Sequence, residues 1–209
     1  EINGTSGFRF LSSPASGTVY GDLLEELWTQ GSTGSDMPNA DPNVWTYDNG
    51  WNDVTNLNSD VLSAGQGIVV YVFSDTDYDG VDDLPVTIGI DTAMNEPTVS
   101  IETNPSDWNL LGNPYGLALD VEHLLGDNPG YHSTVYVYDN ELSAYRTHNG
   151  ITGDLDGGLI SPFSGFWILA DSAGSSFEFT EGSIVNSDSG AGRSTTENST
   201  GSAVFTFHY

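Results

Sequence analysis

The sequence predicts an all-β protein built from two pseudo-repeated halves, each a sandwich-like or barrel-like unit with one short helix, followed by a C-terminal strand. Three observations lead to this prediction. Four sequence blocks recur in the same order along the chain. Aromatic residues and glycine are frequent, with five Trp, ten Tyr, nine Phe and 25 Gly, a composition that favours strands joined by turns. Short apolar segments also alternate with polar residues between turn residues, as strands do.

The internal repeat relates the chain before about Asp91 to the chain after it. In the first block, an aromatic residue, two apolar positions and a proline recur in the same register. Recurrence of four blocks in one order indicates duplication of a supersecondary unit, so we expect two similar halves that share a core. The blocks 8–14, 22–27, 44–49 and 62–68 return as 108–114, 120–125, 135–140 and 160–166.

The repeat also sets the expected domain boundaries. Residues 1–91 form the first β repeat and residues 92–184 the second. Residues 185–202 are rich in Ser, Thr, Gly and Asn, which is typical of a flexible linker. Residues 203–209 then alternate apolar and polar side chains and predict a final strand.

The remaining elements follow from local patterns. A short helix is expected in each half, near 21–28 and near 119–125, because an acidic residue precedes apolar residues at i, i+3 and i+4 spacing and can cap the first turn. The expected strands are 7–12, 43–48, 67–74, 86–91, 98–103, 108–112, 134–139, 165–170, 176–180 and 203–208.

The charge balance excludes several partners. Thirty acidic residues face three arginines and no lysine, giving a formal net charge of −27. Phosphate binding is built from Lys and Arg, so nucleic acid and anionic lipid are not expected as partners. No apolar run approaches the roughly 20 residues needed to cross a bilayer, so membrane insertion is not expected either. A strongly acidic chain without cysteine favours a saline or calcium-bearing setting outside the cell, or on its surface.

An acidic loop after the strand near residue 68 carries the sharpest motif. Carboxylates at alternate positions, followed by Gly80 for a tight turn, are typical of a loop that wraps oxygen ligands around Ca²⁺. Val86 stands where a bidentate Glu would close such a site, so another carboxylate must complete it. The alternative is a solvated acidic hairpin without metal. The expected calcium ligands are the side chains of Asp75, Asp77, Asp79 and Asp83 and the backbone carbonyl of Val81.

Enzyme signatures are sparse, and we do not expect an enzyme. His123, His132, His148 and His208 fit no paired metal-ligand spacing, and each is expected to be a polar surface or turn residue. No Gly-x-Ser-x-Gly elbow presents a nucleophile, and the absence of lysine excludes Schiff-base chemistry and lysine-linked polymers. A hydrolase remains a minor hypothesis because the many carboxylates include no pair singled out by spacing.

Aromatic residues in the paired strands support a second functional hypothesis. Rings held on a flat or grooved surface beside polar groups can stack on sugars. The alternative is that alternate aromatics fill the core, which we expect for Trp108, Phe163, Phe166 and Trp167. Trp51 and Tyr145 are flanked by polar residues and are the candidates for glycan binding.

The repeated signatures carry a family resemblance. Residues 11–14, 27–31, 42–46 and 108–115 resemble a β module of large exported cell-surface proteins of Bacteroidota and their salt-loving relatives, over roughly residues 7–182. The resemblance implies an extracellular, often type IX-secreted protein and no catalytic residues. Thr92 and Ser172 lie in sequences similar to the Asp-Ser/Thr-small motif that Bacteroidota glycosylate, and Asn3 and Asn198 fit the N-glycosylation pattern. The alternative is that these are ordinary turns.

The leading functional hypothesis is a structural surface protein that assembles non-covalently into a filament or layer stabilised by calcium. In that hypothesis the C-terminal strand adds to an open sheet edge of a neighbouring copy, and Val204, Phe205 and Phe207 fill its pockets. The alternative is a carbohydrate-binding or adhesion module of a larger secreted protein, with polysaccharide as the partner.

Overall fold

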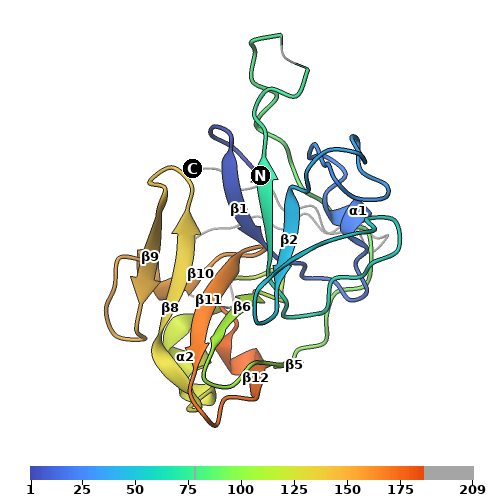
Figure 1. The fold of residues 1–209 in the computed structure, drawn as a ribbon. Helices are drawn as coiled ribbons and strands as arrows, with labels where there is room; N and C mark the ends of the chain where they lie inside the picture. Colours follow the sequence, from blue (N-terminus) through green and yellow to red (C-terminus); the bar gives the residue numbers. More distant parts are fainter. Residues whose placement is uncertain (78, 186–209) are drawn as a thin grey trace, which may run out of the picture.

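Two four-stranded antiparallel sheets form the body of the protein in a computed structural model, which describes residues 1–77 and 79–185 (Figure 1). The predicted all-β class is confirmed. In spatial order, the first sheet contains β1 (Gly7–Leu11), β4 (Ile68–Val72), β2 (Val44–Tyr47) and β3 (Trp51–Asp53). The second contains β6 (Trp108–Gly112), β11 (Gly165–Ala170), β8 (Tyr131–Asp139) and β9 (Ala144–His148).

The two sheets share strand order and register, which confirms the pseudo-repeated halves. Leu11 pairs with Ile68 between β1 and β4, as Leu111 pairs with Phe166 between β6 and β11. The next strand follows the same rule in both sheets. Val44 pairs with Val70, and Val135 pairs with Ile168. A slip of one residue would turn the core-facing side chains of a strand to the other face. The same register is kept in both sheets, although the central strands β4 and β11 are apolar on both faces.

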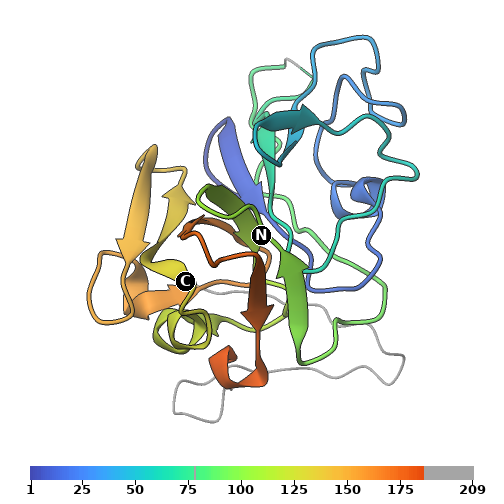
Figure 2. The same cartoon turned by 60° about the horizontal axis from the view of Figure 1, so that its bottom comes forward.

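Shorter elements surround the sheets. Val19 and Val61 form a single bridge where the second half has β7 and β10, and Ile2 and Val86 form one where it has β5 and β12. Figure 2 brings the β5–β12 end of the molecule forward. These elements are β5 (Val99–Glu102), β7 (Leu119–Asp120), β10 (Leu159–Ile160), β12 (Ser176–Phe179), α1 (Tyr20–Leu23), α2 (Val121–Asp127) and the 3₁₀ turns Asp156–Gly158 and Glu181–Ser183.

Each half has its own apolar core, and a third cluster lies between the sheets. Ile68 and Val70 point into the first core, and Phe166 and Ile168 point into the second. The side chain between each pair points the opposite way, so Val69, Trp167 and Leu110 pack together between the two sheets. The expectation of one shared core is therefore replaced by two cores and a joining layer, because alternate residues of a strand face opposite sides.

The halves join by reciprocal backbone contacts, as in a two-fold dimer. Leu11 bridges to Ser164, and its counterpart Leu111 bridges to Gln66. The equivalent residues Ser12 and Gly112 meet at the centre of this seam, where a Cβ added to Gly112 would lie 2.3 Å from the Ser12 Cβ. A pseudo-two-fold axis therefore passes close to these two residues.

Two local predictions are wrong. The strand expected at 86–91 is reduced to the bridge between Val86 and Ile2, because the chain turns away at Gly4 and offers no longer partner. Helix α1 starts after Val19 without a side-chain cap, whereas Asp22 lies within the helix. The second helix is as expected, since the Asp120 carboxylate caps α2 by accepting from two backbone N–H groups.

Candidate functional site

The acidic loop projects from the end of β4, at the top of Figure 1. Carboxylate oxygens of Asp75, Asp77 and Asp83 lie within 4.8 Å of one another. The loop is held by its own backbone, because the N–H of Gly80 donates to Asp75 at 3.1 Å and that of Thr76 donates to Asp83 at 2.7 Å. Three of the four predicted carboxylate ligands therefore converge. Hard oxygen donors of this kind suit Ca²⁺.

Asp79, the fourth predicted carboxylate ligand, is not part of this group. Its carboxylate accepts from the N–H of Val81 at 2.7 Å, which closes a small turn instead of joining the other carboxylates. The backbone carbonyl of Val81 stays a predicted ligand. Hydrogen bonds from the Thr76 hydroxyl and N–H lower the pKa of Asp83, so this carboxylate stays charged in mildly acidic solution.

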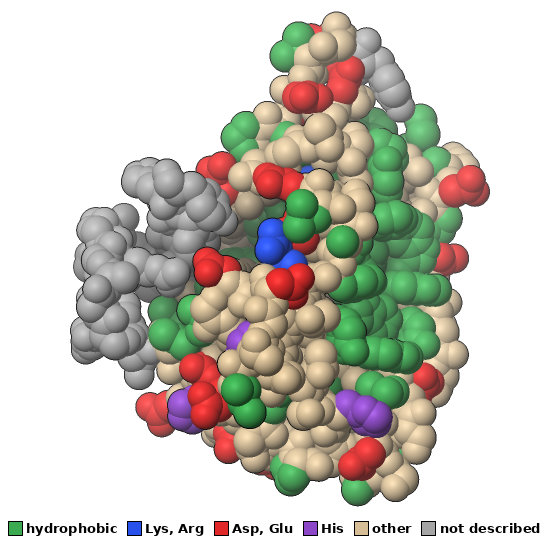
Figure 3. Space-filling view, turned by 90° about the vertical axis from the view of Figure 1, so that its left-hand side faces the viewer, with side chains coloured by type: hydrophobic (Ala, Val, Ile, Leu, Met, Phe, Trp, Pro, Cys, Tyr) green, Lys and Arg blue, Asp and Glu red, His purple; other side chains and the backbone are tan. Residues whose placement is uncertain are grey.

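A layer of aromatic rings covers the side of the two sheets that faces away from the cores. Figure 3 shows hydrophobic side chains gathered in one broad patch, with acidic side chains at its rim. Ring contacts and the joining cluster connect its members into what we call the aromatic face. These members are Phe8, Phe10, Trp45, Tyr47, Trp51, Trp108, Tyr136, Tyr138, Tyr145 and Trp167.

The most exposed rings of this face come in equivalent pairs. Trp51 is 55% exposed and Tyr145 45%, and they occupy the same register position opposite Tyr47 and Tyr138. Phe8 is 43% exposed, and Trp108, its counterpart on β6, is 38% exposed. No other aromatic side chain in the described residues is as exposed as these four.

The two halves exchange ring contacts across the seam. Trp167 of the second half lies 4.8 Å from Tyr47 and 5.8 Å from Trp51 of the first half, both edge-on. In return, Phe10 of the first half lies 5.2 Å from Tyr138 and 6.1 Å from Tyr145. These centroid distances are within the range of favourable aromatic pairs. The exposed rings therefore pack on a layer of buried and partly buried aromatic rings.

The Tyr145 hydroxyl belongs to the same layer. Partial burial raises the pKa of the Tyr145 phenol, and a hydrogen bond with Trp167 opposes that shift. The phenol is therefore neutral at physiological pH and presents both a ring and a hydroxyl.

Polar groups border the aromatic face next to Trp51. The amide of Asn104, in the second half, donates to the Asp48 carboxylate at 2.9 Å and accepts from Asn49 at 3.0 Å. In the second half, Arg146 donates to Asp139 at 2.6 Å. Arg146 pairs with the core-facing Val137 and alternates with Tyr145, so this ion pair lies on the opposite side of the sheet and is not part of the aromatic face.

Part of this surface was predicted from the sequence. Trp51 and Tyr145 were candidates, and the structure brings them to one face. Trp108 was expected in the core and is exposed, because β6 is an edge strand, and its ring meets that of Tyr136 edge-on at 5.2 Å. Phe8 and Phe10 were given no role. Their alternation along β1, matched by Trp108 and Leu110 on β6, is the signal that marks them.

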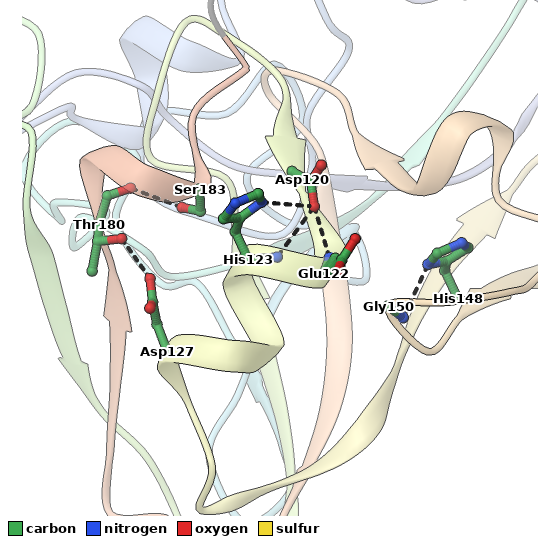
Figure 4. Close-up of polar contacts among 8 residues, drawn as sticks. All are labelled: Asp120, Glu122, His123, Asp127, His148, Gly150, Thr180 and Ser183. Atoms are coloured by element: carbon green, nitrogen blue, oxygen red, sulfur yellow. Dashed lines mark hydrogen bonds and ion pairs between the residues drawn. The ribbon is translucent and has the colours of Figure 1, made fainter.

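The histidines near α2 make structural contacts (Figure 4). His123 lies 3.4 Å from the Asp120 carboxylate that caps the helix. His148 accepts from the N–H of Gly150 at 3.1 Å within a turn. Asp127 accepts from the Thr180 hydroxyl at 2.6 Å and ties the helix to the segment after β12. These contacts stabilise turns and helix ends. His132 is exposed on β8, and His208 lies outside the described residues.

A cleft of about 740 Å³ opens elsewhere, beside α1 and the loop at 161–164. Its lining includes the acidic side chains of Asp22, Glu25, Glu26 and Asp91. The hydrolase hypothesis would need two such carboxylates to face a bound substrate, and it stays a prediction.

The remaining sequence candidates fall into two groups. Asn3, Thr92 and Ser172 are exposed, as an attached glycan requires. Asn198 and the assembly residues Val204, Phe205 and Phe207 lie outside the described residues, as do nearly all of the linker at 185–202 and the whole C-terminal strand.

Comparison with protein families, with curated proteins and with solved structures gave no match for this chain. No helix in the described residues is long and apolar enough to cross a membrane. Function is therefore inferred from the site itself.

Proposed function

We propose that this chain is a carbohydrate-binding or adhesion module that acts outside the cell or on its surface, with the aromatic face as its binding surface. One observation carries the proposal. The four most exposed aromatic side chains among the described residues all lie on this face, in two equivalent pairs. Exposed rings gathered in this way mark an interaction surface, because apolar area left in water is unfavourable.

The chemistry of the face matches a sugar ligand. The C–H faces of pyranose rings are apolar and pack on aromatic rings, while their hydroxyl groups need hydrogen-bond partners. Asp48, Asn49 and Asn104 supply carboxylate and amide groups beside Trp51. The buried ring of Trp167 and the partly buried ring of Tyr47 hold Trp51 in place, which reduces the entropy that binding would cost.

Calcium is proposed as a stabilising ion and not as part of the binding surface. The support is the convergence of Asp75, Asp77 and Asp83 in a loop that projects from the end of β4. Three carboxylates without a bidentate Glu suit the weak, millimolar affinity of extracellular modules. Such an affinity, and the strongly acidic composition, agree with a site of action outside the cell.

A binding panel tests the proposed function. Wild type, Trp51→Ala and Tyr145→Ala are incubated with insoluble cellulose, chitin, xylan and mannan, and bound protein is measured. Ile151→Ala is the matched control, because Ile151 is 90% exposed and makes no aromatic contact. We expect wild type and the control to bind at least one polymer, and the two face variants to lose most of that binding. Circular dichroism checks that each variant is folded.

Two results would contradict the proposal. Indifference of wild type to every polymer would remove the carbohydrate function. Sedimentation at high salt then tests whether a second copy of this chain binds the aromatic face. A dimer that Trp51→Ala converts to a monomer would identify the face as a contact between two copies.

The filament hypothesis depends on residues 203–209, outside the described part of the chain, and stays a prediction. It has its own test. Removal of residues 203–209 should abolish any polymer seen by electron microscopy while the body stays folded, and an unchanged polymer would contradict strand addition.

A further inference from the structure

We infer that the aromatic face is one bivalent site for a linear, uncharged polysaccharide, with one stacking position on each half of the chain. The ligand class is a chain of neutral, equatorially substituted pyranoses, which present flat C–H faces along their length. This inference rests on the proposed carbohydrate function and adds the ligand's charge, shape and mode of binding.

The pseudo-two-fold arrangement supplies two stacking positions of the same kind. Trp51 on β3 and Tyr145 on β9 face Tyr47 and Tyr138 at centroid distances of 5.4 and 5.3 Å, both close to edge-on. Each therefore leaves a ring surface open to solvent in the same local setting. A repeating polymer matches such a repeating surface, whereas a single sugar would fill only one of the two positions.

The rings between the two positions form a continuous path. Trp51 lies 5.8 Å from Trp167, Trp167 lies 6.3 Å from Phe10, and Phe10 lies 6.1 Å from Tyr145. Trp167, in the middle of this path, is buried, whereas Trp51 and Tyr145 at its two ends are exposed. A ligand that uses both ends must be extended and several sugar units long.

Charge decides against an anionic polymer. Both arginines of the described residues are already engaged: Arg146 with Asp139, and Arg9 with the carbonyls of Asn3 and Thr5. The hairpin that carries Trp51 also carries the carboxylate of Asp48, and the whole chain has a formal charge of −27. Uronic acids or sulfate esters would meet repulsion, and neither arginine in the described part of the chain is free to offset it.

Calorimetry with oligosaccharides of increasing length tests bivalency. Cellulose and chitin oligomers, from disaccharide to hexasaccharide, are titrated into wild type, Trp51→Ala, Tyr145→Ala and the double variant. We expect the hexasaccharide to bind wild type one to one, and each single variant to lose about 100-fold in affinity, because one anchor of a linked pair is removed. With the disaccharide, each single variant should retain its affinity while the stoichiometry falls from two to one.

A matched pair of polymers tests the charge requirement. Hydroxyethyl cellulose and carboxymethyl cellulose share a backbone and differ in charge. In affinity electrophoresis at low salt we expect the neutral polymer to retard wild type and the charged one to do so at least about tenfold less. The difference should shrink as salt screens the carboxylates.

The outcomes separate this inference from the proposed function. If one variant abolishes binding at every length and the other changes nothing, there is a single site: bivalency is overturned and carbohydrate binding stands. Equal retardation by the charged polymer, or binding of mannan without binding of cellulose, chitin or xylan, overturns the ligand class alone. Failure of every glycan in the panel and in both series overturns the proposed function itself.

Discussion

In the second half of the molecule, α2 and the β5–β12 pair cover the inner face of the sheet, whereas in the first half that face is covered by a four-residue helix and long loops. Although different elements pack on their inner faces, the two sheets have the same strand order and register. The side chains that point inward from each strand therefore fix how the strands pair. The helices and loops packed on the inner face need only supply apolar residues of suitable volume. Tyr20, Leu23, Leu27 and Leu57 supply them in the first half.

The largest expected effect comes from truncating equivalent core residues. Phe166→Ala and Ile68→Ala each remove a fully buried side chain, from the second and the first core. We expect losses in the free energy of unfolding of about 3–5 kcal/mol for Phe166→Ala and about 2–5 kcal/mol for Ile68→Ala. Chemical denaturation followed by tryptophan fluorescence measures both.

The same experiment shows whether the halves are one cooperative unit. The seam and the cluster around Trp167 join them, so we expect a single transition that both variants shift. Two transitions, each moved by one variant only, would show that the halves unfold separately.

Calcium should distinguish the halves next. The acidic loop follows β4, whereas the chain after its counterpart β11 makes a short turn in which Ala173 donates to Asp171. At a calcium concentration 100 times the dissociation constant, we expect a stabilisation of about 2.7 kcal/mol. Thermal melts with calcium and with chelator measure it. Asp77→Asn should reduce the shift and Asp171→Asn should keep it; an identical melting temperature with chelator would mean that the loop binds no calcium.

The two helices predict a smaller difference. Asp120 caps α2 with bonds of 2.8 and 3.1 Å to the N–H groups of Glu122 and His123. Asp120→Ala should therefore cost about 1 kcal/mol of unfolding free energy, and Asp22→Ala less than about 0.5 kcal/mol. Urea denaturation provides both values. Equal losses would mean that the two helix starts are alike in solution.

The smallest effect concerns Asp139 and pH. Bonds from the Leu142 N–H and from Arg146 lower the pKa of Asp139 in the folded state. A carboxyl with a lowered folded pKa stabilises the protein above its unfolded pKa of about 4, and this stabilisation is lost as pH falls through the folded value. Being near the surface, it contributes at most about 1 kcal/mol. Asp139→Asn should narrow the stability gap between pH 7 and strongly acidic solution, and an unchanged gap would contradict this role.

The sequence predicted the central strands of the two sheets better than their edge strands and the elements that pack on them. Short apolar segments between turn residues and the repeated blocks predicted β1, β2, β4, β6, β8 and β11. The central strands β4 and β11 give the strongest apolar signal because both of their faces are buried. The short edge strands β3 and β9 were not located, since three to five mostly exposed residues carry little apolar signal. The strand expected at 86–91 failed for another reason: its pairing depends on a distant partner that only the fold supplies.

The candidate site was predicted in part for similar reasons. Asp75, Asp77 and Asp83 could be read from local spacing, but which carboxylate turns inward depends on loop hydrogen bonds such as that of Asp79. Trp51 and Tyr145 could be named from their polar neighbours. Their equivalence, and the support from Trp167 and Phe10, depends on contacts across the seam that no single strand encodes.

The pairing of Ser12 with Gly112 limits how symmetric this protein can be. The Ser12 hydroxyl donates to the carbonyls of Asn113 and Ser164, and its Cβ occupies the space a side chain at Gly112 would need. Two identical copies would have to place either two serines there, which would collide, or two glycines, which would forfeit both hydroxyl bonds. Because the two halves of this chain differ at this position, one fills the gap and the other leaves it open, which two identical copies in a symmetric dimer could not do.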